Sequence, residues 1–245
     1  MFEFFKKKKV LANFSGISTD MHSHLLPGID DGSPDVETSI ALIRGLMELG
    51  YKKFTTTPHI MWDIYQNTHE TINAAHTVLK NALKKEKIKV NIRAAAEYFL
   101  DDHFDQLLED KTPLLTIHNN LVLVEFSFVN SPFDLKEKLF KLQMSGYQPV
   151  LAHPERYLYF RDNKEFYNTL KNAGCLFQLN LLSLSNYYGK ASTELAHYLI
   201  KKEYIDLLGT DLHHERHLES LRFSGSTMGT INKLLDSGKI LNGSF

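Results

Sequence analysis

Seven short apolar runs alternate along this chain with segments whose apolar residues recur at helical spacing. The apolar runs lie near residues 16–21, 53–57, 90–96, 121–126, 149–152, 175–179 and 205–209. The helical patterns include residues 34–49, 68–85, 132–144, 164–172 and 190–202. Alternation of this kind predicts an α/β fold with a mostly parallel sheet and crossover helices. Seven strands are enough to close into an irregular barrel, and an open doubly wound sheet is the alternative.

The length and composition predict one domain over residues 1–245, with residues 1–15 as a partly ordered N-terminal tail. A chain of 245 residues has a usual length for one α/β barrel. Its 43% hydrophobic and 23% charged residues are typical of a globular protein with a large core.

Charge and cysteine content bear on the compartment and the partners. Cys175 is the only cysteine, so an internal disulfide is excluded and a reducing cytoplasm is the natural setting. A formal net charge of −1 offers no basic excess for nucleic acid. The Lys6–Lys9 run beside Phe2, Phe4 and Phe5 allows at most peripheral contact with an anionic membrane. The sequence leaves open whether the chain forms a homo-oligomer.

Histidines and carboxylates follow six of the seven predicted strands. They stand in the motifs DMHSH and IDDG, TTTPH, AAAEY, LVEF, LAHPER and GTDLHH. The strong donors among them are His22, His24, Asp31, His59, Glu97, Glu125, His153, Asp211 and His213. The carboxyl ends of parallel strands meet on one face of a barrel, where active sites form. We therefore expect these side chains to gather on that face.

This donor set predicts a site for several metal ions. Imidazoles and carboxylates without thiolates suit zinc, manganese and iron. One ion cannot use nine donors, whereas two or three divalent ions can, with Glu97 or Asp211 bridging them. Metals about 3.5–4 Å apart are a known device for hydrolysing phosphoesters. A lone histidine at a strand end is more often structural, but purely structural use of all nine residues would bury several charges in need of partners.

The charge of such a site favours an anionic substrate, because three divalent ions outweigh four carboxylates. Arg156 follows His153 by three residues and is a candidate for bidentate contact with phosphate. Arg216 follows His213 by three residues and is a weaker candidate for the same role. The candidate catalytic residues are thus Arg156, Arg216 and Asp31. Asp20 is expected to orient His22 or its strand.

With these residues in view, the chain resembles the PHP superfamily and, more narrowly, the bacterial PHP protein-tyrosine phosphatases of capsule and exopolysaccharide synthesis, the CpsB/YwqE group. The resemblance extends roughly from Thr19 to Arg222. It rests on the ordered motifs DMHSHLLPGIDDGS, TTTPHI, AAAEYF, VEFSF, LAHPERY and GTDLHH. It implies a distorted (β/α)7 TIM-like barrel of the PHP type whose three metal ions are held by the nine donors named above.

The resemblance also implies a reaction and a partner. A water activated between the ions attacks phosphorus while Arg156 binds the phosphate. The substrate is phosphotyrosine on a partner tyrosine autokinase that controls polysaccharide export. Manganese is the first choice of metal, with iron, zinc or magnesium as alternatives. The second arginine of the family stands further from the Asp-x-His motif than Arg216 does, and His214 replaces a common Asn, so Arg216 and Arg222 both stay open for that role.

Alternatives to this function are another PHP enzyme, such as a histidinol-phosphate-like phosphatase or a phosphodiesterase, and a metal-binding regulatory or assembly protein. A cysteine-dependent tyrosine phosphatase requires an arginine six residues after its cysteine, and Leu181 stands at that offset from Cys175. We interpret Cys175 as a buried strand residue. Five aromatic residues either wall a slot for a phosphotyrosine ring or pack on the barrel rim: Tyr157, Tyr159, Phe160, Tyr187 and Tyr188.

Overall fold

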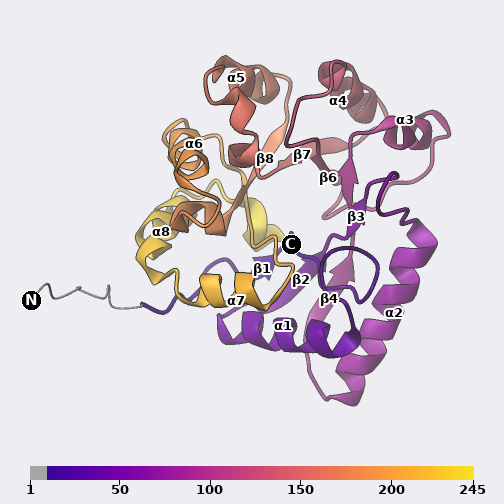
Figure 1. Ribbon diagram of the computed structural model, residues 1–245, viewed down its shortest axis with the longest axis vertical. Helices are drawn as coiled ribbons and strands as arrows, with labels where there is room; N and C mark the ends of the chain where they lie inside the picture. The colour runs from indigo at the N-terminus through magenta and orange to yellow at the C-terminus, as the bar shows by residue number, and fades with distance from the viewer. Residues whose placement is uncertain (1–9) are drawn as a thin grey trace, which may run out of the picture.

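A computed structural model describes residues 10–245, so the Lys6–Lys9 run and its neighbouring phenylalanines lie outside the described residues. The strands are β1 (Thr19–Asp20), β2 (Lys53–Thr56), β3 (His59–Ile60), β4 (Asn91–Ala94), β5 (Glu97–Phe99), β6 (Leu121–Glu125), β7 (Gln148–Ala152), β8 (Leu176–Asn180) and β9 (Leu207–Gly209). The α-helices are α1 (Val36–Glu48), α2 (His69–Lys85), α3 (Asp102–Glu109), α4 (Leu135–Met144), α5 (Glu165–Asn172), α6 (Lys190–Lys201), α7 (Glu215–Arg222) and α8 (Met228–Asp236). Strands and helices alternate along the chain, and the helices surround the strands (Figure 1).

The strands form an α/β fold in which every assigned strand pair is parallel. One sheet has the order β1-β2-β4 and the other β3-β5-β6-β7-β8-β9. The order follows the chain without the reversal that a doubly wound sheet requires. Short helices connect the neighbouring strands, as the alternation of patterns predicted.

Two of the seven predicted strands are each followed, after a short break, by a second strand that begins beyond the predicted range. Residues 53–57 lead from β2 into β3, and residues 90–96 lead from β4 into β5. Pro58 lies at the first break, where a residue without an N–H group cannot continue the ladder. Both breaks fall at the same level, because Thr56 pairs with Ala94 and His59 with Glu97. That register sets the His59 and Glu97 side chains beside each other.

The chain segment after β1 runs beside the segment after β9. Thr210 donates its backbone N–H and its hydroxyl to the Asp20 carboxylate, at 3.0 and 2.8 Å. A parallel bridge joins Ser23 to Leu212, and the N–H of His24 donates to the carbonyl of Leu212 at 2.9 Å. These contacts bring the first and last strand ends of the chain together.

Helix α1 illustrates why these segments become helical. Asp35 is its N-cap, and the Asp35 carboxylate accepts a hydrogen bond from the N–H of Thr38 at 2.8 Å. Its buried side includes Ile40, Leu42, Ile43 and Leu46. Burying each such side chain contributes about 1.5–3 kcal/mol, which exceeds what helix propensity alone supplies.

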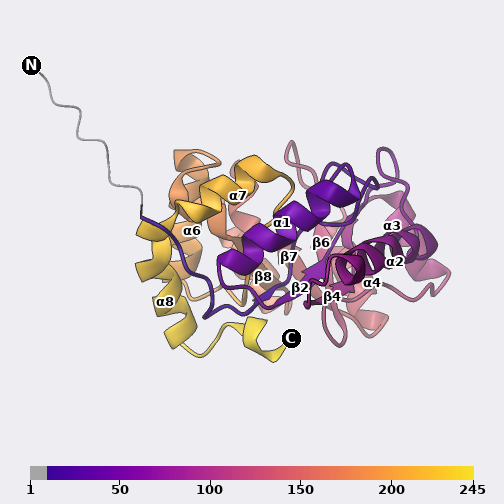
Figure 2. The same ribbon diagram turned by 90° about the horizontal axis from the view of Figure 1, so that it is seen from below.

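The described part of the predicted tail packs on the domain. Ala12 and Phe14 are buried, the N–H of Phe14 donates to the carbonyl of Leu49, and that of Ala12 donates to the carbonyl of Arg222. In the view of Figure 2, this segment passes close to α1 and α7, which lie side by side. Among the helices within residues 10–245, none is long and apolar enough to cross a membrane.

Candidate metal centre

The structure brings eight of the nine predicted donors into three overlapping groups. Within each group, the candidate donor atoms lie within 4.8 Å of one another. The first group is His24, Asp31, His59 and His213. The second group is His22, His24, Glu97 and Asp211. The third group is His59, Glu97 and Glu125.

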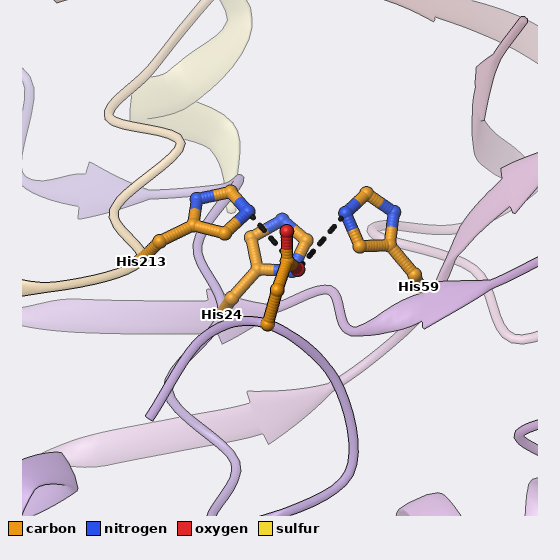
Figure 3. Close-up of side chains that lie close together, drawn as sticks. His24, His59 and His213 are labelled. Carbon is orange, nitrogen blue, oxygen red and sulfur yellow. Dashed lines mark ion pairs between the residues drawn. The ribbon is translucent and has the colours of Figure 1, made fainter. Parts of the chain in front are cut away.

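The first group is the most open of the three. His24, His59 and His213 point toward one another in Figure 3, where dashed lines mark the ion pairs of His59 and His213 with Asp31. The Oδ1 atom of Asp31 lies 3.5 Å from the Nε2 atom of each of these two rings. Asp31 is 51% exposed, whereas the imidazoles are largely covered. The first group is therefore the part of the site that solvent reaches.

His153 borders the third group. Its Nε2 atom lies 3.3 Å from Oε1 of Glu97 and 3.8 Å from Oε2 of Glu125. Glu97 thus stands between the second and third groups, in contact with imidazoles of both. A carboxylate in this position suits the bridging role that the sequence suggested for it.

The imidazole–carboxylate distances in the groups suit ligands that share an ion, and some of the buried donor atoms have no hydrogen bond. His59 Nδ1 and Glu125 Oε1 are 2.9 Å apart, yet both are buried atoms without a hydrogen bond. Other imidazole–carboxylate contacts in the groups are 3.1–3.5 Å long. Two ligands that each lie about 2.0–2.2 Å from one ion are about 3.0–3.5 Å apart. Because buried polar atoms are normally hydrogen-bonded, this donor set fits divalent metal ions.

The charges around the donors also favour cations. Burial alone lowers the pKa of a histidine, but the charges of Glu125 and Glu97 and a hydrogen bond with Glu125 together outweigh burial and raise the pKa of His59 to about 9. In the same way Asp30 raises the pKa of His24 well above its ordinary value despite complete burial. His24 and His59 therefore lie in a negative field, which attracts positive ions, whereas burial and the charge of His24 lower the pKa of His213 to about 4.

Three hydrogen-bond acceptors orient the imidazole rings, and two of them belong to residues outside the predicted set, Gln178 and Asp30. Nδ1 of His22 lies 2.7 Å from the amide oxygen of Gln178, and Nδ1 of His24 lies 2.8 Å from Oδ2 of Asp30. Nδ1 of His213 lies 2.9 Å from the backbone carbonyl of Asp211. Each of these oxygens only accepts, so each Nδ1 donates and each Nε2 is left to face the donor groups. Asp30 and Gln178 are functional residues that sequence reasoning missed.

Asp20 acts on the strand and not on the ring of His22. Both carboxylate oxygens accept from Thr210, which fixes the start of the segment that carries Asp211. Burial raises the pKa of Asp20 to about 6, and its hydrogen bonds with Thr210 partly offset that rise.

The backbone at the site is strained and closely packed. His153 and Asp211 have φ angles of 35° and 50°, the left-handed region that costs a non-glycine residue of the order of 1–3 kcal/mol. A Cβ on Gly32 would lie 2.3 Å from the carbonyl oxygen of His24, and one on Gly209 would lie 2.8 Å from Cβ of His22. Glycine at both positions therefore allows the backbone to lie close to His24 and His22.

Arg156 lies directly beside the donor groups. Its Nη1 donates to Oδ2 of Asp211 at 2.7 Å. The guanidinium carbon lies 4.5 Å from the ring centre of Phe128 and 4.3 Å from that of Tyr188. These residues line a hollow of about 260 Å³. Asn180 donates to the same Asp211 oxygen at 2.9 Å.

Within residues 10–245, the other candidate arginines form no hydrogen bond or ion pair with the donor groups. Arg216 is exposed on the first turn of α7, and its side chain forms no ion pair or hydrogen bond with the described residues. Arg222 pairs with Glu48 at 3.1 Å near the surface. Both lie on α7, the helix that follows the motif with Asp211 and His213.

The aromatic residues after the strand ends separate into two kinds. Tyr157 and Phe160 are buried and pack in the core, whereas Tyr188 covers Arg156. Phe128, which sequence reasoning did not single out, covers the guanidinium as well. Cys175 is buried, as predicted, but lies directly before β8 and not in the strand, and burial raises the pKa of its thiol to about 12.

This α/β fold gathers buried imidazoles and carboxylates at the ends of its strands. Such an arrangement is typical of metal-binding hydrolases. More narrowly, the chain belongs to the family described as capsular polysaccharide synthesis, CpsB/CapC, whose model matches residues 18–222. The resemblance drawn from the sequence motifs is thereby confirmed.

Curated relatives and solved structures agree with this membership. The chain is 29% identical over 194 residues to the tyrosine-protein phosphatase YwqE of Bacillus subtilis (strain 168), covering 79% of this chain and 76% of YwqE. It is 27% identical over 200 residues to the tyrosine-protein phosphatase CpsB of Streptococcus agalactiae serotype V, covering 79% of this chain and 82% of CpsB.

The fold is similar to a structure from work on YwqE of B. subtilis and CpsB of Streptococcus pneumoniae, described as unique metal-dependent tyrosine phosphatases. The TM-score is 0.78 at 27% identity, over 89% of each chain. An amidohydrolase from Mycoplasma synoviae, 12% identical with a TM-score of 0.53 over 96% of this chain and 87% of its own, shares the fold alone.

Proposed function

We propose that this chain is a metal-dependent protein-tyrosine phosphatase that hydrolyses phosphotyrosine on a partner protein. The observation that carries the proposal is the set of three overlapping donor groups with Arg156 bound to one of their carboxylates, Asp211. The relatives named as tyrosine-protein phosphatases support the substrate class. The structural similarity to metal-dependent phosphatases supports the cofactor.

The residues proposed to hold two or three divalent ions are His22, His24, Asp31, His59, Glu97, Glu125, His153, Asp211 and His213. Such ions, when bound, supply positive charge and lower the pKa of water. Manganese is the proposed metal, and iron, zinc and magnesium fit the same donor types to different degrees. His24, His59 and Glu97, each shared by two groups, keep the proposed ion sites close together.

Arg156 is proposed to bind the phosphate. The rings of Phe128 and Tyr188 hold its guanidinium plane, and Asp211 uses one of its five N–H donors. The remaining donors are available for phosphate oxygens in a fixed plane, which suits bidentate contact. An arginine positioned in this way stabilises charge on the transferring group without rearranging during the reaction.

Asp31 and Arg216 complete the proposed catalytic residues. Asp31 is the exposed carboxylate of the first group, so an incoming phosphate and water meet it first. Arg216 stays a candidate for phosphate contact from the first turn of α7, three residues after His213. The phenol of tyrosine has a pKa of about 10, so the departing phenolate needs no strong general acid.

The fold is proposed to be a distorted (β/α)7 barrel of the PHP type, in one domain over residues 1–245. Joined at their breaks, β2 with β3 and β4 with β5 give seven strand segments in chain order. The contact of Asp20 with Thr210 and the bridge of Ser23 to Leu212 support closure between the first and last segments. Barrel closure places all nine donors around one rim.

The proposed partner is a tyrosine autokinase of capsular or extracellular polysaccharide synthesis, and the proposed compartment is the cytoplasm. The family description supports the process. The reduced state of the lone Cys175 agrees with the compartment.

The test compares phosphate release from a phosphotyrosine peptide, from histidinol phosphate and from a phosphodiester. We expect the peptide to be the preferred substrate. Replacing His22→Ala and His24→Ala together should lower its hydrolysis by at least ~10² with the fold retained by circular dichroism, because the ions supply the nucleophile and much of the charge stabilisation. Faster turnover of histidinol phosphate or the diester would contradict the proposal.

A further inference from the structure

A loop at the rim of the site, residues 127–133, presents apolar side chains to solvent. Val129 is 83% exposed, and Phe133 is fully exposed at the end of the same loop. Leaving such a side chain in water forgoes the free energy that its burial supplies. Neighbouring exposed apolar side chains on a soluble protein indicate a binding surface.

Hydrogen bonds to the rest of the protein hold the base of this rim loop, whereas the hydrogen bonds at its tip stay within the loop. Phe126 donates its N–H to the Tyr157 hydroxyl at 3.3 Å, and Tyr159 donates its hydroxyl to the carbonyl of Ser127 at 2.9 Å. At the tip the hydrogen bonds stay within the loop, such as that from the N–H of Val129 to Oγ of Ser127. The loop therefore holds Val129 outward from a fixed base.

The rim loop is continuous with the phosphate site. Phe128 lies under the Arg156 guanidinium at 4.5 Å, and its ring centre is 5.4 Å from that of His153. Glu125, a proposed ligand, precedes the loop by one residue, Phe126. A molecule that contacts Val129 and Phe133 is thus adjacent to whatever Arg156 binds.

Given the proposed function, we infer that the rim loop docks the polypeptide that flanks the phosphotyrosine of a protein substrate, and that it favours apolar residues there. A membrane or a second copy of the chain bound to this loop would lie beside the opening of the donor groups. It would therefore hinder access to Asp31 and Arg156. A polypeptide that carries the phosphotyrosine can contact the rim loop and Arg156 at the same time. Its main chain passes over the rim loop while its phosphotyrosine reaches the donor groups.

The test uses two phosphotyrosine peptides of equal length, one flanked by leucine and valine and the other by serine and glycine, together with p-nitrophenyl phosphate. The variant carries Val129→Ser and Phe133→Ser. Phe140→Ser is the matched control, because Phe140 is an equally apolar, 61% exposed side chain on α4 and outside the loop. Fluorescence anisotropy of the labelled peptides in the presence of chelator measures docking without turnover.

We expect the double variant to lose about tenfold in kcat/KM on the apolar peptide, through KM and with kcat unchanged, which corresponds to about 1.4 kcal/mol of binding. Hydrolysis of the serine–glycine peptide and of p-nitrophenyl phosphate should stay at the wild-type rate, and Phe140→Ser should change none of the three. Anisotropy should show the same loss of affinity for the apolar peptide.

An equal fall on all three substrates, or no fall on any, would overturn the inference. So would a change of oligomeric state in sedimentation, which would identify a self-interface, or a loss of flotation with anionic vesicles, which would identify a membrane surface. If the wild type hydrolysed none of the three compounds, the proposed function would fail. The anisotropy comparison would then still decide whether the loop docks apolar peptide.

Discussion

The Nδ1 atom of His24 lies 2.8 Å from Oδ2 of Asp30, and both groups are buried. The same carboxylate accepts the backbone N–H of His59 at 3.1 Å and, through Oδ1, that of Gly32 at 3.0 Å. Burial raises the pKa of a carboxyl, but the charge and hydrogen bond of His24 outweigh it and hold the pKa of Asp30 at about 2. Asp30 therefore fixes both the ring of His24 and the loop that carries Asp31.

Removing this carboxylate should weaken metal binding. We expect Asp30→Ala to lower metal affinity by about 10–100-fold, because the ring of His24 loses the partner that orients it and makes it more basic. Competition titration with a chromogenic chelator measures the affinity directly. Asp63→Ala, at an exposed position after β3, is the control. Equal affinity in the Asp30 variant and wild type would remove Asp30 from the site.

Arg156→Lys should separate phosphate binding from metal binding. Lysine keeps a charge near Asp211 but cannot offer planar paired donors between Phe128 and Tyr188. We expect kcat/KM on a phosphotyrosine peptide to fall by about 10²–10³ while the bound metal per chain is unchanged. Arg161→Lys, an exposed residue that pairs with Glu194, is the control. Parallel loss of metal would mean that Arg156 acts only by supporting Asp211.

Cys175→Ser should leave catalysis intact. The thiol is buried on the strand side of the core, and burial raises its pKa to about 12, so little thiolate forms at neutral pH. We expect wild-type turnover in the variant and no inactivation of the native protein by iodoacetamide. Rapid inactivation of folded enzyme by the reagent, absent from the serine variant, would contradict the metal-based reaction.

His76 should make stability depend on pH. It lies on α2, half-buried, and its Nε2 is 3.1 Å from the carbonyl of Ile92. Burial lowers its pKa below the ordinary 6.5, so the unfolded chain binds a proton first as pH falls. Stability from the neutral ring is present above about pH 6.5 and declines as pH falls below that value.

Urea unfolding of chelator-treated protein at pH 7.5 and pH 5.5 measures this effect. We expect His76→Gln, which keeps an N–H donor, to lose less stability than wild type between the two conditions. His69→Gln, exposed at the start of the same helix, should behave as wild type. A variant with an unchanged pH dependence would show that His76 is not linked to folding.

Eight of the nine side chains that the sequence singled out gather in the structure, because period-two spacing and strand ends are local properties of the sequence. His22 and His24 share one face in DMHSH and lie in the same group. The sequence could not distinguish the two neighbouring aspartates of IDDG. One of them, Asp30, turns inward to His24, and the other, Asp31, faces the open side of the first group, a difference that the path of the loop determines.

Other parts of the site depend on contacts between distant segments. Gln178 lies 156 residues from the His22 ring that it orients, in a strand that reads as apolar. A polar amide inside such a strand is the one local signal that could have indicated it. The break at residues 57–58 has a local signal in Pro58, whereas the break at residues 95–96 and the left-handed backbone of His153 have none in the spacing of the sequence.

Metal content measured together with activity tests the central claim most directly. Purified protein would be analysed for bound metals by elemental analysis, assayed on a phosphotyrosine peptide, stripped with chelator, and assayed again after stepwise return of manganese. We expect two or three divalent ions per chain, loss of turnover on stripping and recovery as the ions are returned. Full turnover by protein that contains no metal would contradict the claim.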